Sequence, residues 1–255
     1  MTTVAYDGTY EGLFSAIFEI YEYRFSDVEI YETGFVNTSF FGGVHLVHTD
    51  AEKSKRVYKK LEQRISAKAM NNLYKAFLSG EKKMPGVLLR LVQYVLASKV
   101  SVECDYNNAD ILWVQQMSRK VDREKHRMEA FVRFQLAKDE LYYAIVQPDY
   151  NVLPLISNHF EKRYAGQRWL IYDSIRKYGI YYDLHKVETV EMTFNPDMDN
   201  EGTITELSDP DENLYQQLWQ QYFTSINIKA RKNMKLHLQH IPRRYWKFLT
   251  EKKLL

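Results

Sequence analysis

Residues Phe131 to Val146 read FVRFQLAKDELYYAIV, and within this stretch the spacing of apolar residues changes from a helical to a two-residue period. Residues 131–136 follow the alternating period, and 141–146 are rich in residue types that favour strands. Residues 137–140 between them suit a turn. The pattern predicts an antiparallel hairpin, because two β-type runs joined by a short polar connection pair with each other.

The hairpin begins a predicted central antiparallel sheet. A helix is expected over 153–163, and three strands are expected over 169–172, 180–182 and 187–194. The short connections between these strands predict a meander, in which each strand pairs with the next.

The chain before this sheet is predicted to be mainly helical. Short strands are expected over 4–6 and 44–47. Asp50 is expected to cap a helix, Gly80 to end one and Pro85 to lie in the first turn of another. Apolar residues recur at helical spacing over 10–25, 57–65, 70–78 and 88–96, and a polar helix covers about 109–126.

The chain after the sheet begins with a loop over 195–202 and continues with a helix opened by Asp209-Pro210-Asp211-Glu212. Short helices joined around Pro242 follow. The whole pattern predicts an α+β fold with a helical N-terminal part, a central antiparallel sheet and a basic helical C-terminal segment. Because no Gly/Ser/Pro-rich linker divides the chain, we expect one domain over 1–255, with sub-parts 1–128, 129–208 and 209–255.

The composition excludes several classes of protein. Hydrophobic residues make up 45% of the chain and charged residues 27%, as in globular domains. Cys104 is the single cysteine, which excludes a disulfide scaffold and a cysteine-built zinc or iron–sulfur site within this chain. No stretch resembles a membrane span or a secretion signal, so we expect a cytoplasmic protein.

Charge is concentrated near the C-terminus. The formal net charge is +2, yet residues 225–255 hold nine cations and one acid, a local charge of +8. Such a segment binds phosphate because counterion release favours the complex, although it could equally balance the acidic remainder of the chain. We expect Trp246 and Tyr222 to be mostly core residues. The residues expected to contact nucleic acid are Lys229, Arg231, Lys232, Asn233, Lys235, Arg243, Arg244 and Lys247.

Titratable and guanidinium side chains gather around the ends of the central strands, which is typical of a binding site. The candidate catalytic residues are Asp149, Asn151, His159, Arg163, Arg176 and His126. The alternative is a structural network in which Arg176 pairs with Asp173 and residues 149–151 form a plain turn. The histidines show no recognised metal-binding spacing, so we expect neither a metal nor a cofactor.

Several longer motifs resemble a known family. In chain order they are Tyr6-Asp7-Gly8-Thr9-Tyr10-Glu11-Gly12, Glu124-x-His126-Arg127-Met128, Pro148-Asp149-x-Asn151-x-Leu153, Trp169-x-Ile171-Tyr172-Asp173, Trp219-x-x-Tyr222-Phe223 and Pro242-Arg243-Arg244-Tyr245-Trp246. From Val4 to about Glu251 the chain resembles the bacterial family labelled probable DNA metabolism protein, domain of unknown function 4130. Ala130 and Ile241 stand where this family's pattern leads us to expect Gly and Met.

The resemblance implies which proteins this chain works with, but it implies no reaction mechanism. Members are typically encoded beside a radical-SAM protein of DNA modification or repair, and some are fused to a uracil-DNA glycosylase-like domain. The leading hypothesis is therefore a DNA-binding accessory protein that works with the radical-SAM partner. The alternatives are an enzyme acting on nucleic acid or a nucleotide through the central His/Arg/Asp cluster, and a protein–protein adaptor for that partner.

Overall fold

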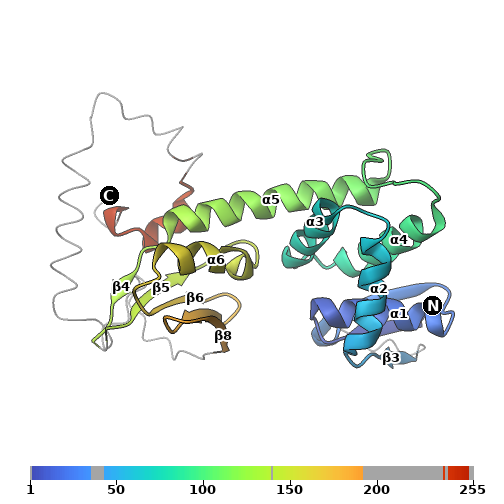
Figure 1. Cartoon of the computed structure of the whole chain (residues 1–255), viewed down its shortest axis with the longest axis horizontal. Helices are drawn as coiled ribbons and strands as arrows, with labels where there is room; N and C mark the ends of the chain where they lie inside the picture. The colour runs from blue at the N-terminus through green and yellow to red at the C-terminus, as the bar shows by residue number, and fades with distance from the viewer. Residues whose placement is uncertain (1, 36–42, 139, 192–237, 239–240, 253–255) are drawn as a thin grey trace. The chain divides into compact units, whose positions relative to one another are not determined.

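The computed structural model describes residues 2–35, 43–138, 140–191, 238 and 241–252 (Figure 1). The chain divides into two compact units, Met1–Asp122 and Arg123–Leu255, and each is described by itself. Helix α5 (Ala109–Phe131) contributes its first part to the N-terminal unit and its last turns to the C-terminal unit.

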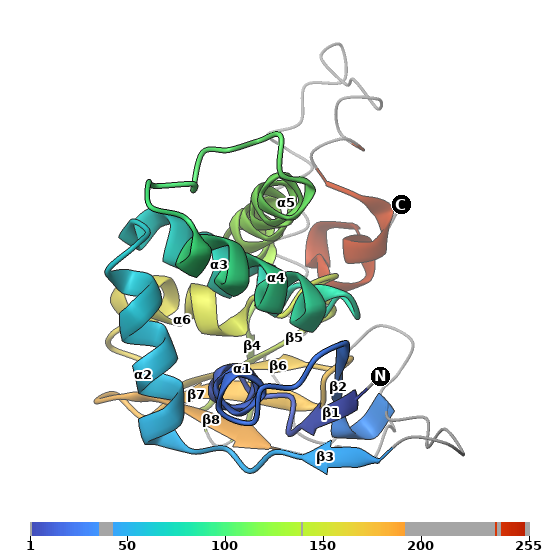
Figure 2. The ribbon, with the colours of Figure 1, turned by 90° about the vertical axis from the view of Figure 1, so that its right-hand side faces the viewer.

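The N-terminal unit begins with a small parallel sheet. Its strands are β1 (Thr2–Tyr6), β2 (Val28–Glu32) and β3 (Val44–Leu46), in the order β2-β1-β3. Helix α1 (Tyr10–Glu22) packs against β1 and α2 (Figure 2), and buries Leu13, Phe14 and Ile17. The sequence predicted two of these strands. It missed β2, in which the run VEIYE carries Glu29 and Glu32 and buries only Ile30.

Three further helices lie wholly within this unit. They are α2 (Ala51–Glu62), α3 (Ala67–Leu78) and α4 (Met84–Ala97). The three helix-end predictions are confirmed. The Asp50 side chain accepts hydrogen bonds from the first backbone N–H groups of α2, Pro85 lies in the first turn of α4, and Gly80 follows α3 with φ +66°.

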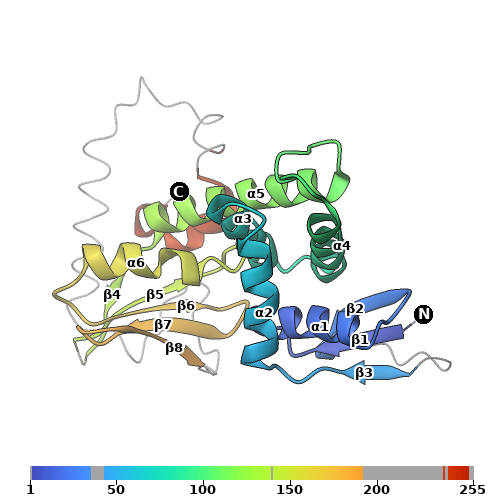
Figure 3. The same cartoon turned by 45° about the vertical axis from the view of Figure 1, so that its right-hand side comes forward.

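The C-terminal unit is built on a five-stranded sheet in the order β4-β5-β6-β7-β8. The strands are β4 (Gln135–Leu136), β5 (Tyr142–Val146), β6 (Trp169–Asp173), β7 (Tyr178–Tyr182) and β8 (Val187–Glu191). Helix α6 (Leu153–Arg163) covers one face (Figures 1 and 3), where Phe160 lies 6.1 Å from the fully buried Trp169 ring. The meander of β6, β7 and β8 is confirmed.

The prediction of a purely antiparallel sheet is wrong in one pairing. β4 and β5 form the predicted hairpin, but β5 and β6 are parallel. Helix α6 lies between β5 and β6 in sequence, and a helical crossover is the connection that parallel neighbours require. The sequence predicted α6, but the parallel direction of β5 and β6 that follows from this connection was not predicted.

The start of the hairpin is also corrected. Helix α5 continues to Phe131, and the first strand is only the two-residue β4. The Phe131 ring lies 5.9 Å from the buried Tyr245 ring, and the backbone N–H of Val132 bonds to Met128 O. These contacts favour the helix over the strand that the alternation of 131–134 had predicted.

The C-terminal residues that the structure describes form two short 3-10 helices, η3 (Arg243–Phe248) and η4 (Thr250–Lys252). Phe248 packs against the second face of the sheet, on a cluster that includes Tyr143, Ile145 and Tyr172. The predictions for the loop 195–202 and the helix opened by Asp209 lie outside the described residues.

Candidate functional site

Strands β5 and β6 are parallel, so their carboxyl ends meet at one edge of the sheet, a common place for binding sites. The loop after β5 is held there by Arg176, whose guanidinium donates to Pro148 O at 3.1 Å and to Asp149 O at 3.0 Å. Arg176 also pairs at 2.8 Å with Asp173, a fully buried carboxylate at the end of β6. The Arg176–Asp173 pair predicted by the structural alternative is therefore present.

Glu124, on α5, is the centre of the arrangement, and only 1% of its side chain is exposed. One oxygen accepts the Asp149 backbone N–H at 2.9 Å and the Tyr245 hydroxyl. The other oxygen accepts from Arg244 at 3.3 Å and Arg127 at 3.4 Å. These four donors replace the hydrogen bonds to water that the carboxylate loses on burial.

Arg244 joins the C-terminal segment to the sheet edge. Its guanidinium lies 2.5 Å from Asp149 Oδ2, bonds to the Tyr245 hydroxyl at 2.7 Å, and sits 4.5 Å from the centre of the Tyr245 ring. Burial would lower the pKa of Arg244, but Tyr245, Asp149 and Glu124 outweigh burial and raise it. Burial first, and then Glu124, raise the pKa of Tyr245 as well. Both groups are therefore protonated donors at neutral pH.

We refer to the residues of this arrangement as the Glu124 cluster; they are Glu124, Arg127, Asp149, Asp173, Arg176, Arg244 and Tyr245. The cluster holds three carboxylates and three guanidinium groups, so its formal charges cancel. Such a cluster has little net attraction for an anion. Its contacts hold the start of η3 against α5 and against the loop after β5.

The structure brings together three of the six candidate catalytic residues. Asp149 and Arg176 belong to the Glu124 cluster, and Asn151 lies in the same loop, where its Oδ1 accepts the Tyr178 hydroxyl. His126 is 86% exposed on α5 and lies 3.9 Å from Glu129.

The remaining two candidates lie on α6, away from its start at this edge. His159 is about 9 Å along the helix from Leu153 at 1.5 Å per residue. Its ring lies 5.1 Å from Phe160, and its Nε2 is enclosed without a hydrogen-bond partner among the described residues. Arg163 is exposed, and its guanidinium lies 5.8 Å from the Tyr164 ring.

Three of the residues expected to contact nucleic acid lie in η3. Arg243 and Lys247 are exposed, whereas Arg244 is engaged by carboxylates. Arg243 lies 6.0 Å from the Trp246 ring and Lys247 lies 4.8 Å from the Phe248 ring. The others, Lys229, Arg231, Lys232, Asn233 and Lys235, lie outside the described residues.

The burial of the aromatic residues of η3 differs from the prediction that Trp246 is mostly a core residue. Trp246 is half-buried and donates its Nε1–H to Ile241 O at 3.0 Å, while its neighbour Tyr245 is 2% exposed and provides the buried ring. Tyr222 lies outside the described residues.

Sequence reasoning missed Glu124 and Tyr245 as site residues. A signal for Glu124 is present in the sequence, because it follows Met117 and Val121 at helical spacing and precedes Met128 by one turn. These three residues are at most 2% exposed. A carboxylate on the buried stripe of a helix requires partners, and the partners come from distant segments.

In the N-terminal unit, the carboxyl end of β1 also carries a polar motif. Asp7 accepts hydrogen bonds from the Thr9 backbone N–H and hydroxyl and, at 2.6 Å, from the Thr49 hydroxyl. Burial would raise the pKa of Asp7, but these bonds outweigh it and lower the pKa. A Cβ atom on Gly12 would lie 2.1 Å from Asp7 Oδ1, so this motif requires glycine at position 12.

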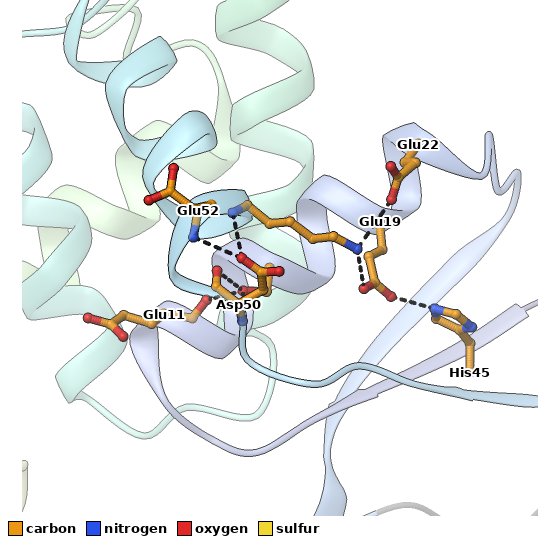
Figure 4. A network of polar contacts seen from close by, with 8 residues as sticks. Glu11, Glu19, Glu22, His45, Asp50 and Glu52 are labelled. Atoms are coloured by element: carbon orange, nitrogen blue, oxygen red, sulfur yellow. Dashed lines mark hydrogen bonds and ion pairs between the residues drawn. The ribbon is translucent and has the colours of Figure 1, made fainter.

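Figure 4 shows a second polar network of this unit, which ties α1 to α2 and β3. The Glu19 carboxylate accepts from Lys53 Nζ at 2.9 Å and lies 2.6 Å from His45 Nε2. Burial would raise the pKa of Glu19, but Lys53 and His45 outweigh it and lower the pKa. The ionised carboxylate is therefore favoured by the folded state.

We expect acid to weaken the N-terminal unit partly through Glu19. A group with a lowered folded pKa stabilises the fold above its unfolded pKa, about 4.3, and loses that contribution as the pH falls through the folded pKa. Glu19→Gln should therefore lose less stability than the wild type between about pH 7 and pH 3. Urea unfolding at both pH values measures this, with exposed Glu11→Gln on the same helix as control. Equal losses in wild type and Glu19→Gln would contradict the assignment.

The N-terminal unit also contains two cavities. One of about 120 Å³ has apolar walls from α2, α3, α4 and α5, with Leu73, Leu88 and Val92 among them. The other, of about 390 Å³, is lined by residues of α1, α2 and α3, three of them tyrosines. Over the part of the chain that the structure describes, no group of three or more His, Cys, Asp or Glu residues could hold a metal ion. No described helix is long and apolar enough to cross a bilayer.

Comparison with known families gives one match that covers most of the chain. The family described as Domain of unknown function (DUF4130) matches residues 82–251, which are two thirds of the sequence. The chain belongs to this family. The DUF4130 match contains every residue of the Glu124 cluster, while the motif from Tyr6 to Gly12 precedes it.

A second, shorter match covers residues 57–101, from the middle of α2 to just beyond α4. This part of the DUF4130 protein is similar to the dimerisation domain of programmed cell death protein 10. The similarity covers less than a fifth of the chain. No curated protein matches the chain.

Proposed function

We propose that this DUF4130 protein binds the DNA backbone through its basic C-terminal segment, residues 225–255, as an accessory of a DNA modification or repair system. The observation that supports this most strongly is the division of roles within η3. The buried Tyr245 and the paired Arg244 hold the turn in place, and the neighbouring Arg243 and Lys247 remain exposed. Fixed, exposed cations lose little conformational freedom when they contact phosphate.

The chemistry of the segment favours phosphate over an acidic protein surface. Arginine forks onto phosphate oxygens, and each neutralised phosphate releases counterions. Trp246 is half-buried beside Arg243, and Phe248 lies beside Lys247, so each exposed cation of η3 has a ring next to it. This combination is typical of surfaces that contact nucleic acid.

The resemblance described above supplies the proposed partner, a radical-SAM protein. Radical-SAM chemistry uses an iron–sulfur cluster held by several cysteines. Cys104 is the single cysteine of this chain, so that chemistry would belong to the partner. The role proposed for the present chain is to hold DNA for the partner.

The enzyme hypothesis has less support from the site. The oxygens of Glu124 and Asp173 are occupied by protein donors, and Arg176 is bonded to the backbone of the β5 loop. A general base needs an oxygen or nitrogen within reach of the substrate proton. His159 Nε2, which has no partner among the described residues, is the one observation that favours this hypothesis.

Co-purification of the intact protein with the radical-SAM protein encoded beside it, with and without DNA, tests the proposal. We expect the protein alone to bind DNA and the complex with the partner to be strengthened by DNA. A complex that forms equally well after nuclease treatment, from a chain that binds no DNA, would favour the adaptor hypothesis instead.

A further inference from the structure

The apolar cavity of the N-terminal unit is not used by the proposed function. Its volume is about 120 Å³, and its walls come from α2, α3, α4, the loop that follows α4 and the start of α5. Six apolar residues of these walls belong to the core and yet each keeps 6–9% of its surface exposed; they are Ile65, Leu91, Val95, Val102, Ile111 and Val114. The cavity therefore has an accessible surface, and most of that surface is aliphatic.

The size of the cavity limits what it can hold. An engineered apolar cavity of about 150 Å³ in another protein stays dry and binds benzene. A cavity of about 120 Å³ accordingly holds a hydrocarbon group of about six carbons. Covering the aliphatic walls with such a group removes apolar surface from water, which favours binding. The walls therefore predict a ligand with a branched or ring-shaped hydrocarbon part.

Two polar side chains of the lining come from one face of α3. Lys68 and Asn72 are four residues apart, a spacing that makes them neighbours on a helix. Lys68 is exposed and makes no ion pair within the part of the chain that the structure describes. Asn72 Oδ1 accepts the Ser118 hydroxyl at 2.8 Å, which leaves the NH2 group of Asn72 to donate. An ammonium and an amide NH2 side by side suit a carboxylate, which accepts hydrogen bonds only.

Glu103 is the other charged residue of the lining, and it is already engaged. Its Oε2 accepts the Ser66 backbone N–H at 2.7 Å, at the positive end of α3. Gln115 is engaged as well, because its Nε2 donates to the Tyr106 hydroxyl at 3.0 Å. Lys68 is therefore the charged group that remains for a ligand, which favours an anionic head group over a cationic one.

We propose that this cavity binds a small monocarboxylate whose hydrocarbon part is branched or aromatic. The hydrocarbon part fills the space between α3, α4 and α5, and the carboxylate accepts from Lys68 Nζ and from the NH2 group of Asn72. The apolar walls supply most of the affinity, and the head group selects an acid over an amine of the same shape. The inference is independent of the DNA-binding function proposed above, because every residue named lies within the unit Met1–Asp122.

Saturation-transfer NMR of the full-length protein with three probes tests the proposal. Phenylacetate, phenylacetamide and 2-phenylethylamine share a ring and differ in the charge of the head group. We expect phenylacetate to bind with a dissociation constant of around 1 mM or below. The amide should bind about threefold more weakly, because it keeps the ring and loses the charge that pairs with Lys68. The amine should bind at least tenfold more weakly than phenylacetate, roughly the effect of replacing attraction to Lys68 by repulsion.

Cys104 reports whether the ligand occupies this cavity rather than another surface. It lines the cavity, is exposed, and is the single cysteine of the chain. Saturating phenylacetate should therefore slow the alkylation of Cys104 by iodoacetamide at least twofold, as quantified by mass spectrometry. Phenylacetate bound to the basic C-terminal segment would leave this rate unchanged.

Two variants separate the head group from the hydrocarbon part. Lys68→Gln should weaken the binding of phenylacetate about threefold and leave that of phenylacetamide unchanged, with Lys60→Gln as an exposed control outside the cavity. Ala69→Leu adds a larger side chain to the lining, so it should abolish the binding of both probes without lowering Tm. Its control is Ala51→Leu at the exposed start of α2.

Four results would overturn the proposal: none of the probes binds, the amine binds as tightly as phenylacetate, phenylacetate leaves the alkylation rate of Cys104 unchanged, or Lys68→Gln binds phenylacetate like the wild type. Each of these results leaves the proposed DNA binding intact, because the probes contain no phosphate and the variants lie outside residues 225–255. A protein that binds phenylacetate as expected but binds no DNA would lose the proposed function and keep this inference.

Discussion

Replacing Tyr245 by alanine is expected to destabilise the C-terminal unit by about 3–5 kcal/mol, the range for removing a large buried ring. Tyr245 is 2% exposed, and its hydroxyl donates to the buried Glu124 carboxylate. The substitution therefore creates a cavity and also removes a donor from a buried charge. A thermal melt of the full chain, followed by circular dichroism, measures the loss.

Two further variants show which part of Tyr245 matters. Tyr245→Phe keeps the ring and removes only the hydroxyl, so the expected loss is smaller, about 1–3 kcal/mol. Lys247→Ala changes an exposed residue of the same 3-10 helix and should leave the melt unchanged. A Tyr245→Ala protein that melts like the wild type would show that the Glu124 cluster does not fasten the C-terminal segment.

Removing Arg243 and Lys247 together is expected to weaken DNA binding without unfolding the protein. Each lost phosphate contact lowers the slope of log K against log salt by about 0.9, so two contacts lower it by about two. At about 0.15 M salt that change corresponds to roughly 30-fold weaker binding. Fluorescence anisotropy with a labelled oligonucleotide at several salt concentrations measures both quantities.

The matched control for this variant is Lys55→Ala with Lys60→Ala, which removes two exposed cations from α2 and changes the net charge equally. It should bind DNA like the wild type. Arg244 is left unchanged in both variants, because its guanidinium pairs with Glu124 and Asp149 and its loss would disturb the fold. An Arg243/Lys247 variant with the wild-type slope would place the phosphate contacts elsewhere.

Local features of the fold could be predicted from the sequence because they depend on neighbouring residues. Asp50 caps α2 through backbone groups two and three residues away, and Pro85 begins α4 by its fixed φ. Strand direction is different. The pairing of β5 with β6 is fixed by the path of α6 across the sheet, which the strand sequences themselves do not encode.

The site could be predicted only in part, for the same physical reason. Asp149 and Asn151 share the loop after β5, Arg176 follows Asp149 by 27 residues just after β6, and the structure places all three at one sheet edge. Glu124 and Tyr245 are 121 residues apart, and their contact depends on the packing of the whole unit. Tyr245 and Trp246 are adjacent rings in a short 3-10 turn, where apolar spacing alone does not indicate which ring is buried.

Lysine reactivity in the presence of DNA tests the proposed function most directly. The intact protein is acetylated with and without an oligonucleotide, and each modified lysine is quantified by mass spectrometry. The account predicts that DNA protects lysines of the C-terminal segment, among them Lys229, Lys232, Lys235 and Lys247, while Lys55 and Lys60 on α2 react equally in both samples. Equal reactivity of the C-terminal lysines with and without DNA, or protection confined to other parts of the chain, would contradict it.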